Sequence, residues 1–591
     1  MAEPRPNGPI VHLGFDSCGG EALARLFRTN DLSALVWEKG ALAREIVYRD
    51  AANRRAPSDW QRADLLAELH HHDTSRAPAF GFERFEWLDR QLPGATFVLT
   101  LRDVEGWAAD RLGATTLGRS ARETARRLGC APSDLPEIWI ADWDRHITRV
   151  RAHFADRPNY LEIDLEGLDW HALRERLARG GVTGLDRLPP RPAERVLDFG
   201  AVPAAGRVMD LLTETAPIIS HGGPIDQALV DELLPFCLGV MRHGTEGVAD
   251  PGRSFSDIYA YHDGAGGVFG RSGMRAEIDF DPLHDQFVAR PVGGKIDRTE
   301  AVLNQLHTLG RLTPVQIDMA DARHFGAAGR PQTQYPTLTY NRREGAVNVV
   351  LWPLPGFHEI GTPAFALPYN PDSVSFDEKE DRVMWRGNLS GVSRRPGGAN
   401  GPGAIRLAGI IGDEQRSPLE RAAAARAMRT IPRLAVLERY GARTDMDLGL
   451  VMSLAIKRAG EMPQLDAAIR PRLSIRQMLS CRWQLCLAGY DVGTNFVWAA
   501  NSNSVVLKEE AGWEVYFSAL FRPWEHYVPL APAAADLEER LDWARANPAL
   551  TAQMSAESRH QVHRLADYPT QRALMRAIAE SIPAIPPPFG S

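Results

Sequence analysis

The stretch of sequence that most limits the possible fold of this chain is 476–530. Within it, 483–487 is an apolar run of strand length, and a turn that contains Gly489 follows. Gly493 then begins a short helix, and 504–507 returns as a second buried strand. A strand, a helix and a strand in this order predict a parallel α/β unit of the nucleotide-binding kind.

The start of this helix, at Gly493 and Thr494, is a candidate anion site. The first backbone N–H groups of a helix have no partner inside the helix, and the positive end of the peptide dipoles lies there. Phosphate is the ligand that such a turn favours. Many α/β proteins also place a glycine turn before a helix for packing alone, so this alternative stays open.

Two runs in this stretch resemble the glycosyltransferase family 90 domain: GYDVGTNFVWAANSNSVVLKEE at 489–510 and FRPWEHYVPL at 521–530. That family includes protein O-glucosyltransferases and transferases that modify capsule or lipopolysaccharide. The resemblance implies a GT-B-like pair of Rossmann-like lobes, with the active site in the cleft between them. It also assigns the loop that wraps the donor diphosphate to Tyr490, Asp491, Val492, Gly493, Thr494 and Asn495.

The resemblance extends to the start of the donor lobe, where VMWRGNLSG at 383–391 is similar to a nucleotide-sugar-binding loop. It implies donor contacts by Asn388 and Arg394. Arg394 would offer a forked cation to the diphosphate. Its alternative is plain surface charge, and Arg395 beside it leaves the register open. Eukaryotic relatives carry Arg where this chain has Asn495, so the helix start and Arg394 would balance the diphosphate charge here.

The candidate catalytic base comes from the segment IDMAD at 317–321, which is similar to the family segment that carries the base. Asp321 falls on that position. Sugar transfer to a hydroxyl needs a group that removes the hydroxyl proton, and an aspartate within hydrogen-bond reach does this. Asp318 is the local rival, because an aspartate at a strand end often only caps a turn. In the run at 521–530, we interpret His526 as a structural histidine.

The N-terminal part predicts a second α/β domain with a P-loop-like, parallel sheet. Strands are expected at 10–15, 95–101 and 160–164, and a glycine-bearing turn leads from the first strand into a helix at 21–28. The layout resembles the sulfotransferase family, whose cofactor is 3′-phosphoadenosine-5′-phosphosulfate. The matching residues are His12, Gly14 and Gly19, with Arg102 in the place of the arginine that holds the 3′-phosphate.

The functional residues of that family are not kept. Ser17 stands at the loop lysine position, Gly20 and Glu21 at the loop threonine positions, and Asp110 where a serine is expected. Each lost charged donor removes roughly 1.5–3 kcal/mol of phosphate binding, and carboxylates near phosphate repel it. We therefore predict a domain that no longer transfers sulfate. For Arg102 the alternative is a surface ion pair with Asp103 or Glu105.

A chain of 591 residues is too long to fold around a single hydrophobic core, so several domains are expected. The expected division is an N-terminal domain at 1–190, a linker at 191–207, an acceptor-side lobe at 208–375, a nucleotide-sugar lobe at 376–575 and a loose proline-rich tail at 576–591.

Charge and cysteine content exclude several classes. A net charge of −7 lacks the basic excess of a nucleic-acid-binding protein. Five scattered cysteines indicate neither a disulfide framework nor a zinc site. The histidines at 70–72 read as a solvated helix end, since consecutive helical residues cannot all ligate one ion. With no signal sequence and no spanning apolar run, the expected location is cytoplasmic, and peripheral membrane association stays open.

The predicted function is that of an inverting glycosyltransferase. It would move a sugar of the glucose or xylose type from a UDP-sugar to a hydroxyl of a surface glycan, lipopolysaccharide or lipid-linked saccharide. No resident cofactor and no metal are expected. Two alternatives stay open: a bifunctional glycosyltransferase and sulfotransferase, and a catalytically silent glycan-binding scaffold.

Overall fold

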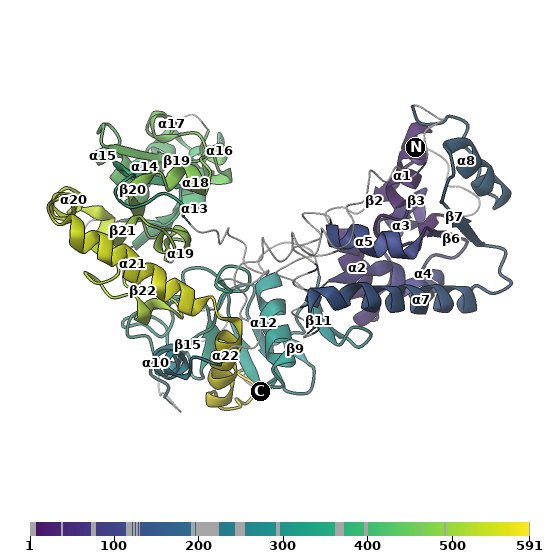
Figure 1. Ribbon diagram of the computed structural model, residues 1–591, viewed down its shortest axis with the longest axis horizontal. Helices are drawn as coiled ribbons and strands as arrows, with labels where there is room; N and C mark the ends of the chain where they lie inside the picture. Colours follow the sequence, from purple (N-terminus) through teal and green to yellow (C-terminus); the bar gives the residue numbers. More distant parts are fainter. Residues whose placement is uncertain are drawn as a thin grey trace. The chain divides into compact units, whose positions relative to one another are not determined.

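The computed structural model describes most of the chain, in two compact units (Figure 1). The first unit comprises Met1–Ala216 and Ala260–Thr313, and the second comprises Pro217–Tyr259 and Pro314–Ser591. The described residues are 8–36, 40–71, 78–113, 121, 124–125, 128, 130–190, 196, 224–242, 255–290, 296–360, 372–394, 400–460, 462–489 and 492–589.

The first unit is built on a five-stranded sheet in the order β2-β3-β1-β6-β7, with every neighbouring pair parallel. This confirms the predicted parallel α/β character. The strands are β1 (Ile10–His12), β2 (Ala34–Val36), β3 (Leu65–Ala67), β6 (Thr96–Leu101) and β7 (Tyr160–Asp164). The main helices are α1 (Gly20–Thr29), α2 (Ala41–Ala51), α4 (Phe85–Gln91), α5 (Val104–Gly113), α7 (Leu135–His153) and α8 (Trp170–Arg179), and α3 (Ser58–Arg62) is a single short turn.

Helices cover both faces of this sheet, because successive strand side chains point to opposite faces. In β6, Phe97 and Leu99 join the core cluster of α4, α5 and α7, whereas Val98 joins the cluster of α1 and α8. A strand buried on both faces needs a continuous apolar run. The run at 95–101 has this property, which is why it was recognisable in the sequence.

The histidine run differs from its prediction. His70–His71 form β4, which pairs antiparallel with β5 (Ala79–Phe80), so this segment is a strand and not a helix end. Pairing with β5 a few residues later overrides the local propensity. His72 lies outside the described residues, among which no cluster of ligands suited to a metal ion occurs.

The first unit contains a segment that was assigned to the acceptor-side lobe at 208–375. Ala260–Thr313 groups with the N-terminal residues. Its buried Glu300 forms an ion pair with the buried Arg44 of α2, and Val288 packs with Val47 and Tyr48. The segment contains β8 (Ala260–His262), β9 (Val268–Phe269), β10 (Ile278–Asp281), β11 (Gln286–Ala289) and α12 (Ile296–Thr308).

A second buried charge network joins this segment to the N-terminal residues. Arg84 contacts Asp281 at 2.5 Å, and His284 bonds both Asp281 at 3.1 Å and Glu83 at 2.8 Å. Burial alone would lower the pKa of His284, but its hydrogen bonds to Asp281 and Glu83 raise the pKa from 6.5 to about 9. The imidazole is therefore a cation at neutral pH and belongs to the ionic core of this unit.

The second unit contains two groups of parallel strands. In the first, β13 lies between β12 and β15, and the second is a five-stranded sheet in the order β19-β16-β20-β21-β23. The strands are β12 (Val315–Ile317), β13 (Thr337–Thr339), β15 (Val349–Leu351), β16 (Glu380–Gly387), β19 (Met446–Leu450), β20 (Cys481–Cys486), β21 (Val505–Glu509) and β23 (Val528–Leu530). Two short strands, β14 (Arg342–Arg343) and β22 (Trp513–Glu514), pair antiparallel with each other.

Helices enclose the five-stranded sheet, and the chain then returns to the first strand group. α22 packs against α10 (Figure 1), and the Ile585 N–H donates to the Pro314 carbonyl at 3.2 Å. The helices are α10 (Gln227–Leu238), α13 (Ala404–Ile411), α14 (Pro418–Arg429), α15 (Pro432–Tyr440), α16 (Leu454–Ala459), α17 (Pro463–Ala468), α18 (Ile475–Met478), α19 (Asn495–Ala500), α20 (Leu537–Ala546), α21 (Pro548–Leu565) and α22 (Tyr568–Ser581).

This return corrects the prediction of a loose tail at 576–591. α22 extends to Ser581, and both Ile582 and Ile585 are buried. The prolines limit the helix but do not prevent the isoleucines between them from packing. Among the helices of the described residues, none combines the length and apolar character that a membrane crossing requires.

Candidate active site

The predicted strand, helix and strand are present in the second unit. β20 and β21 run parallel, and α19 lies between them in sequence. The helix begins at Asn495 with Thr494 as its N-cap residue, slightly later than the predicted start at Gly493. Two of the predicted donor residues lie outside the described residues: Tyr490 and Asp491.

Gly489 lies where the turn approaches a second loop. A Cβ atom there would come within 2.5 Å of the Ser390 hydroxyl and 3.0 Å of the Arg433 guanidinium, so only glycine fits without a shift. Arg433 donates to the carbonyls of Asn388 at 2.9 Å, Leu487 at 2.9 Å and Ala488 at 3.1 Å. The predicted donor loop after β16 and the predicted diphosphate turn are thus joined by one guanidinium.

A hollow opens at this turn. It encloses about 250 Å³ of space, part of which is open solvent. The hollow, called here the turn pocket, is lined by Cys486, Ala488, Val492, Gly493, Lys508, Glu509, Ala511 and Trp513.

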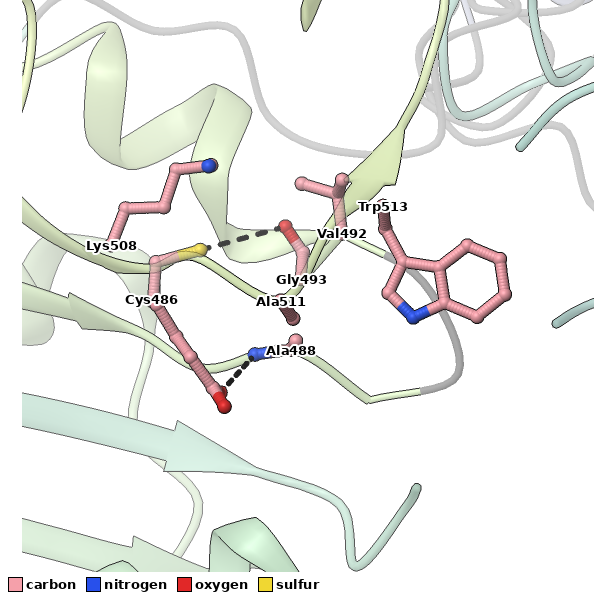
Figure 2. Close-up of a pocket in the computed structure, with 8 residues that line it drawn as sticks. Cys486, Ala488, Val492, Gly493, Lys508, Ala511 and Trp513 are labelled. Carbon is pink, nitrogen blue, oxygen red and sulfur yellow. Dashed lines mark hydrogen bonds between the residues drawn. The ribbon is translucent and has the colours of Figure 1, made fainter. Parts of the chain in front are cut away.

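The side chain of Asn495 holds the turn in place. Its Nδ2 donates to the Leu485 carbonyl at 2.9 Å, and its Oδ1 accepts from the Cys486 thiol at 3.4 Å. The same thiol points at the Gly493 carbonyl, 3.8 Å away (Figure 2). Because the amide of Asn495 is used in this way and α19 has only six residues, backbone groups and nearby cations must supply most of any phosphate binding.

Glu509 fixes the floor of the turn pocket. Its carboxylate accepts from the Ala488 N–H at 3.0 Å and from the Ala533 N–H at 2.7 Å, and the side chain is buried. Burial raises the pKa of Glu509, while these two hydrogen bonds oppose the rise. Ala533 has a φ of 56°, a strained value for a residue with a Cβ. Glu509 therefore positions the turn and is no candidate for an acid or base.

Asn388 and Arg394 lie on the loop region that faces this turn. The side chain of Asn388 is exposed, and its carbonyl accepts from Arg433. Arg394 ends β17 (Val392–Arg394), which pairs with β18 (Asn400–Gly403), and its side chain is exposed. Its charge acts on the pKa of both Glu509 and Arg343, so its guanidinium lies near the turn pocket. Arg395 lies outside the described residues.

The two candidate aspartates have different surroundings. Asp318 is fully buried, pairs with Arg323 at 3.0 Å and accepts from the hydroxyl and the N–H of Ser256 at 2.6 and 2.9 Å. Asp321 is only half-buried and accepts from the Tyr340 hydroxyl at 2.6 Å. Asp318 is thus a structural residue, and Asp321 keeps the partial exposure that a general base requires.

Asp321 lies close in sequence to a residue that touches the turn pocket. The ring of His324 is 4.8 Å from the ring of Trp513, which lines that pocket. Three residues of chain span at most about 11 Å. The backbone of Asp321 is therefore at most about 11 Å from that of His324, whose ring contacts the pocket wall.

Sequence reasoning missed four residues here: His324, Arg343, Lys508 and Trp513. The guanidinium of Arg343 lies 4.9 Å from the centre of the Trp513 ring. Burial, followed by the charges of Arg330, Arg343 and Arg323, lowers the pKa of His324 to about 4, so its imidazole is neutral at pH 7. The pairing of β14 with β22 brings Arg343 to Trp513, and short strands so far apart leave no periodic signal in the sequence.

The candidate phosphate loop of the first unit is occupied by the protein itself. The Glu68 carboxylate accepts the Glu21 N–H at 3.1 Å, at the start of α1. A Cβ atom on Gly20 would lie 2.2 Å from the same carboxylate. Burial and the charges of Asp16 and Glu21 raise the pKa of Glu68 to about 8. The place of a phosphate at this helix start is taken by an internal carboxyl group.

Arg102 is not the surface residue of its alternative interpretation. Its side chain is buried, and its guanidinium contacts Asp110 at 2.8 Å. Asp110 lies in the second turn of α5. The neighbouring Asp16 pairs with Arg111 at 3.1 Å. The cation that would hold a 3′-phosphate is thus already engaged by an aspartate.

Comparisons with known proteins point to the same region of the second unit. Residues 458–566 match the family described as Glycosyl transferase family 90. A stretch of 53 residues is 45% identical to Uncharacterized protein 035R of Invertebrate iridescent virus 3, and 66 residues are 32% identical to Protein O-glucosyltransferase 3 of Rattus norvegicus. Over 93 residues the chain is 29% identical to Protein O-glucosyltransferase 3 of Homo sapiens.

These matches are short. They cover 9%, 11% and 15% of this chain, and the chain spans only 5%, 13% and 18% of those relatives. The matched family segment contains β20, the turn pocket, α19 and β21. Residues 458–566 are therefore similar to glycosyltransferase family 90, which supports glycosyl transfer as the class of activity.

Proposed function

We propose that the second unit is a glycosyltransferase that uses a UDP-sugar and inverts the anomeric configuration. The observation that carries the proposal is the coincidence of the family match at 458–566 with the turn pocket. Arg433 and Glu509 hold the walls of this pocket in a fixed geometry. Two strand groups, with helices that return from one to the other, are consistent with the GT-B-like arrangement that belongs to the proposal.

The reaction is a single displacement. The acceptor oxygen forms a bond to the anomeric carbon as the bond from that carbon to the UDP oxygen breaks, and Asp321 takes the hydroxyl proton. The hydrogen bond from Tyr340 at 2.6 Å orients the Asp321 carboxylate. Negative charge grows on the departing diphosphate, where Arg394 and the N–H groups of Val492, Gly493 and Thr494 would stabilise it.

The substrates are proposed by class. The donor is a UDP-sugar of the glucose or xylose type, and the acceptor is a hydroxyl of a surface glycan, lipopolysaccharide or lipid-linked saccharide. Cationic side chains balance the diphosphate in this scheme, so it includes neither a metal nor a resident cofactor. A cytoplasmic location, with peripheral association to a membrane that presents the acceptor, belongs to the same proposal.

A panel of UDP-sugars tests this function. We expect the purified chain to release UDP from one member of the panel, and the rate to rise when a polysaccharide or lipopolysaccharide acceptor is added. A glycan-binding scaffold would bind such an acceptor and release no UDP from any donor. UDP release assigns the activity and the donor sugar in one measurement.

We further propose that the first unit is an accessory domain without sulfotransferase activity. Glu68 fills the start of α1, Asp110 engages Arg102, and Ser17 replaces the loop lysine. The first phosphate position is then filled by a carboxyl group and the arginine at the second is already paired, so neither position would offer a cation to the cofactor. The domain would then serve assembly or acceptor orientation. Under this proposal the protein is not a bifunctional glycosyltransferase and sulfotransferase.

Calorimetry on the full chain tests this second proposal. We expect no heat of binding with 3′-phosphoadenosine-5′-phosphate at up to millimolar concentration, because Glu68 fills one phosphate position and Asp110 already pairs with Arg102 at the other. The same titration with UDP serves as the control for active protein. Micromolar affinity for the adenosine bisphosphate would show that the domain has kept its cofactor site.

A further inference from the structure

Arg343 is presented to the turn pocket by a strand from outside the five-stranded sheet. β14 pairs with β22 so that Arg342 lies opposite Glu514 and Arg343 opposite Trp513. Arg342 anchors this strand, because it is buried, bonds Glu514 at 2.7 Å and donates to the Phe236 carbonyl at 2.7 Å. Successive strand residues point to opposite sides. Anchoring of Arg342 therefore fixes the direction of Arg343.

The guanidinium of Arg343 lies against the segment that forms one wall of the pocket. It stacks 4.9 Å from the Trp513 ring centre and donates to the Ala511 carbonyl, and both of these residues line the turn pocket. Gly512 between them has a φ of 68°, and a Cβ atom there would lie 2.8 Å from Nη2 of Arg343. The segment at 511–513 is thus shaped around this guanidinium.

This cation is surrounded by others. Burial, followed by the charges of Arg394 and Arg330, lowers the pKa of Arg343, and Glu344 opposes this effect only in part. In the described part of the chain, no carboxylate forms an ion pair with Arg343. A half-buried cation that is held among like charges destabilises the protein by itself. An anion bound beside it would offset that cost.

We propose that Arg343 binds the diphosphate of the nucleotide sugar from the wall that 511–513 forms in the turn pocket; this inference rests on the glycosyltransferase function proposed above. The Asn495 amide is used by Leu485 and Cys486. Arg343 thus adds a second guanidinium to the one that Arg394 provides. As the bond between the anomeric carbon and the UDP oxygen breaks, the added charge on UDP lies between two forked donors.

Nucleotide affinity in the Arg343→Gln variant tests the assignment. We expect calorimetry on the full chain to show UDP binding about 10- to 100-fold weaker than in the unchanged protein, the effect of one lost charged hydrogen bond. Binding of uridine, which has no phosphate, should stay the same. The UDP affinity of Arg343→Lys should lie between those of Arg343→Gln and the unchanged protein, because lysine keeps the positive charge but loses the forked N–H donors and the stacking on the Trp513 ring.

Arg382→Gln is the matched control, because this arginine is 44% exposed and pairs only loosely with Glu380 at 3.5 Å. Its affinity for UDP should not change. Equal UDP affinity in Arg343→Gln and the unchanged protein would overturn the assignment and leave the proposed function intact. If the unchanged protein binds no UDP, the proposed function fails as well. Thermal unfolding of each variant confirms that it is folded. If Arg343→Gln does not fold, the UDP affinity of Arg343→Lys is compared with that of the unchanged protein instead.

Discussion

Replacing Asp321 by asparagine should lower the rate of UDP-sugar turnover by about 10²- to 10⁴-fold, the usual contribution of a general base. Asparagine has nearly the same shape but cannot accept the acceptor proton. The Tyr340 hydroxyl can still donate to the amide oxygen, so the local structure should persist. Affinity for UDP should remain within about twofold, because in the proposed reaction Asp321 acts on the acceptor and not on the donor.

Asp318→Asn is the matched comparison for this experiment. Asp318 is fully buried and bonded to Arg323 and Ser256, so its loss should lower the free energy of unfolding rather than act on the chemical step alone. Initial rates with saturating donor and thermal unfolding of both variants separate the two roles. Normal turnover by Asp321→Asn would exclude this residue as the base.

Arg44→Ala should destabilise the first unit by about 3–5 kcal/mol, because it leaves the Glu300 carboxylate buried without its cation. Both side chains of this pair are almost completely buried. The Glu300 carboxylate also accepts the Ala289 N–H at 2.8 Å, so the loss should reach β11. Denaturant unfolding of the full chain, followed by tryptophan fluorescence, measures the change in the transition of this unit.

Two variants define what that result means. Arg62→Ala removes an ion pair whose side chains are 68% and 75% exposed, and should change the free energy of unfolding by less than about 1 kcal/mol. The double variant Arg44→Met with Glu300→Gln removes both charges and should recover much of the lost stability. A small change in the free energy of unfolding for Arg44→Ala alone would mean that the stability of the segment 260–313 does not depend on its ion pair with the N-terminal residues.

The sequence was informative wherever one local pattern determines the structure. The strand at 160–164 was predicted at its observed bounds. His526 was predicted as structural and is buried, with its Nδ1 accepting the Arg522 N–H at 2.9 Å. Each of these features depends on neighbours within a few residues.

The features that were missed depend on contacts between distant residues. The pair of Arg44 with Glu300 joins residues 256 positions apart, so 260–313 could not be separated from 208–375 by composition. Arg343 meets Trp513 through a two-residue strand, which is too short for a periodic signal. For the candidate site, the choice of Asp321 over Asp318 came from the family resemblance, whereas the different burial of the two is visible only in the fold.

The insertion of Ala260–Thr313 into the first unit affects how the protein is made. A ribosome releases the chain from its N-terminus, so the sheet of β1, β2, β3, β6 and β7 is complete well before Glu300 and Asp281 emerge to pair with Arg44 and Arg84. At a synthesis rate of about 5–20 residues per second, the roughly one hundred residues between Ala216 and Thr313 impose a delay of about 5–20 s. During that interval the nascent domain lacks the Glu300 carboxylate and the apolar side chain of Val288 that pack against α2, which makes it a natural client for chaperones.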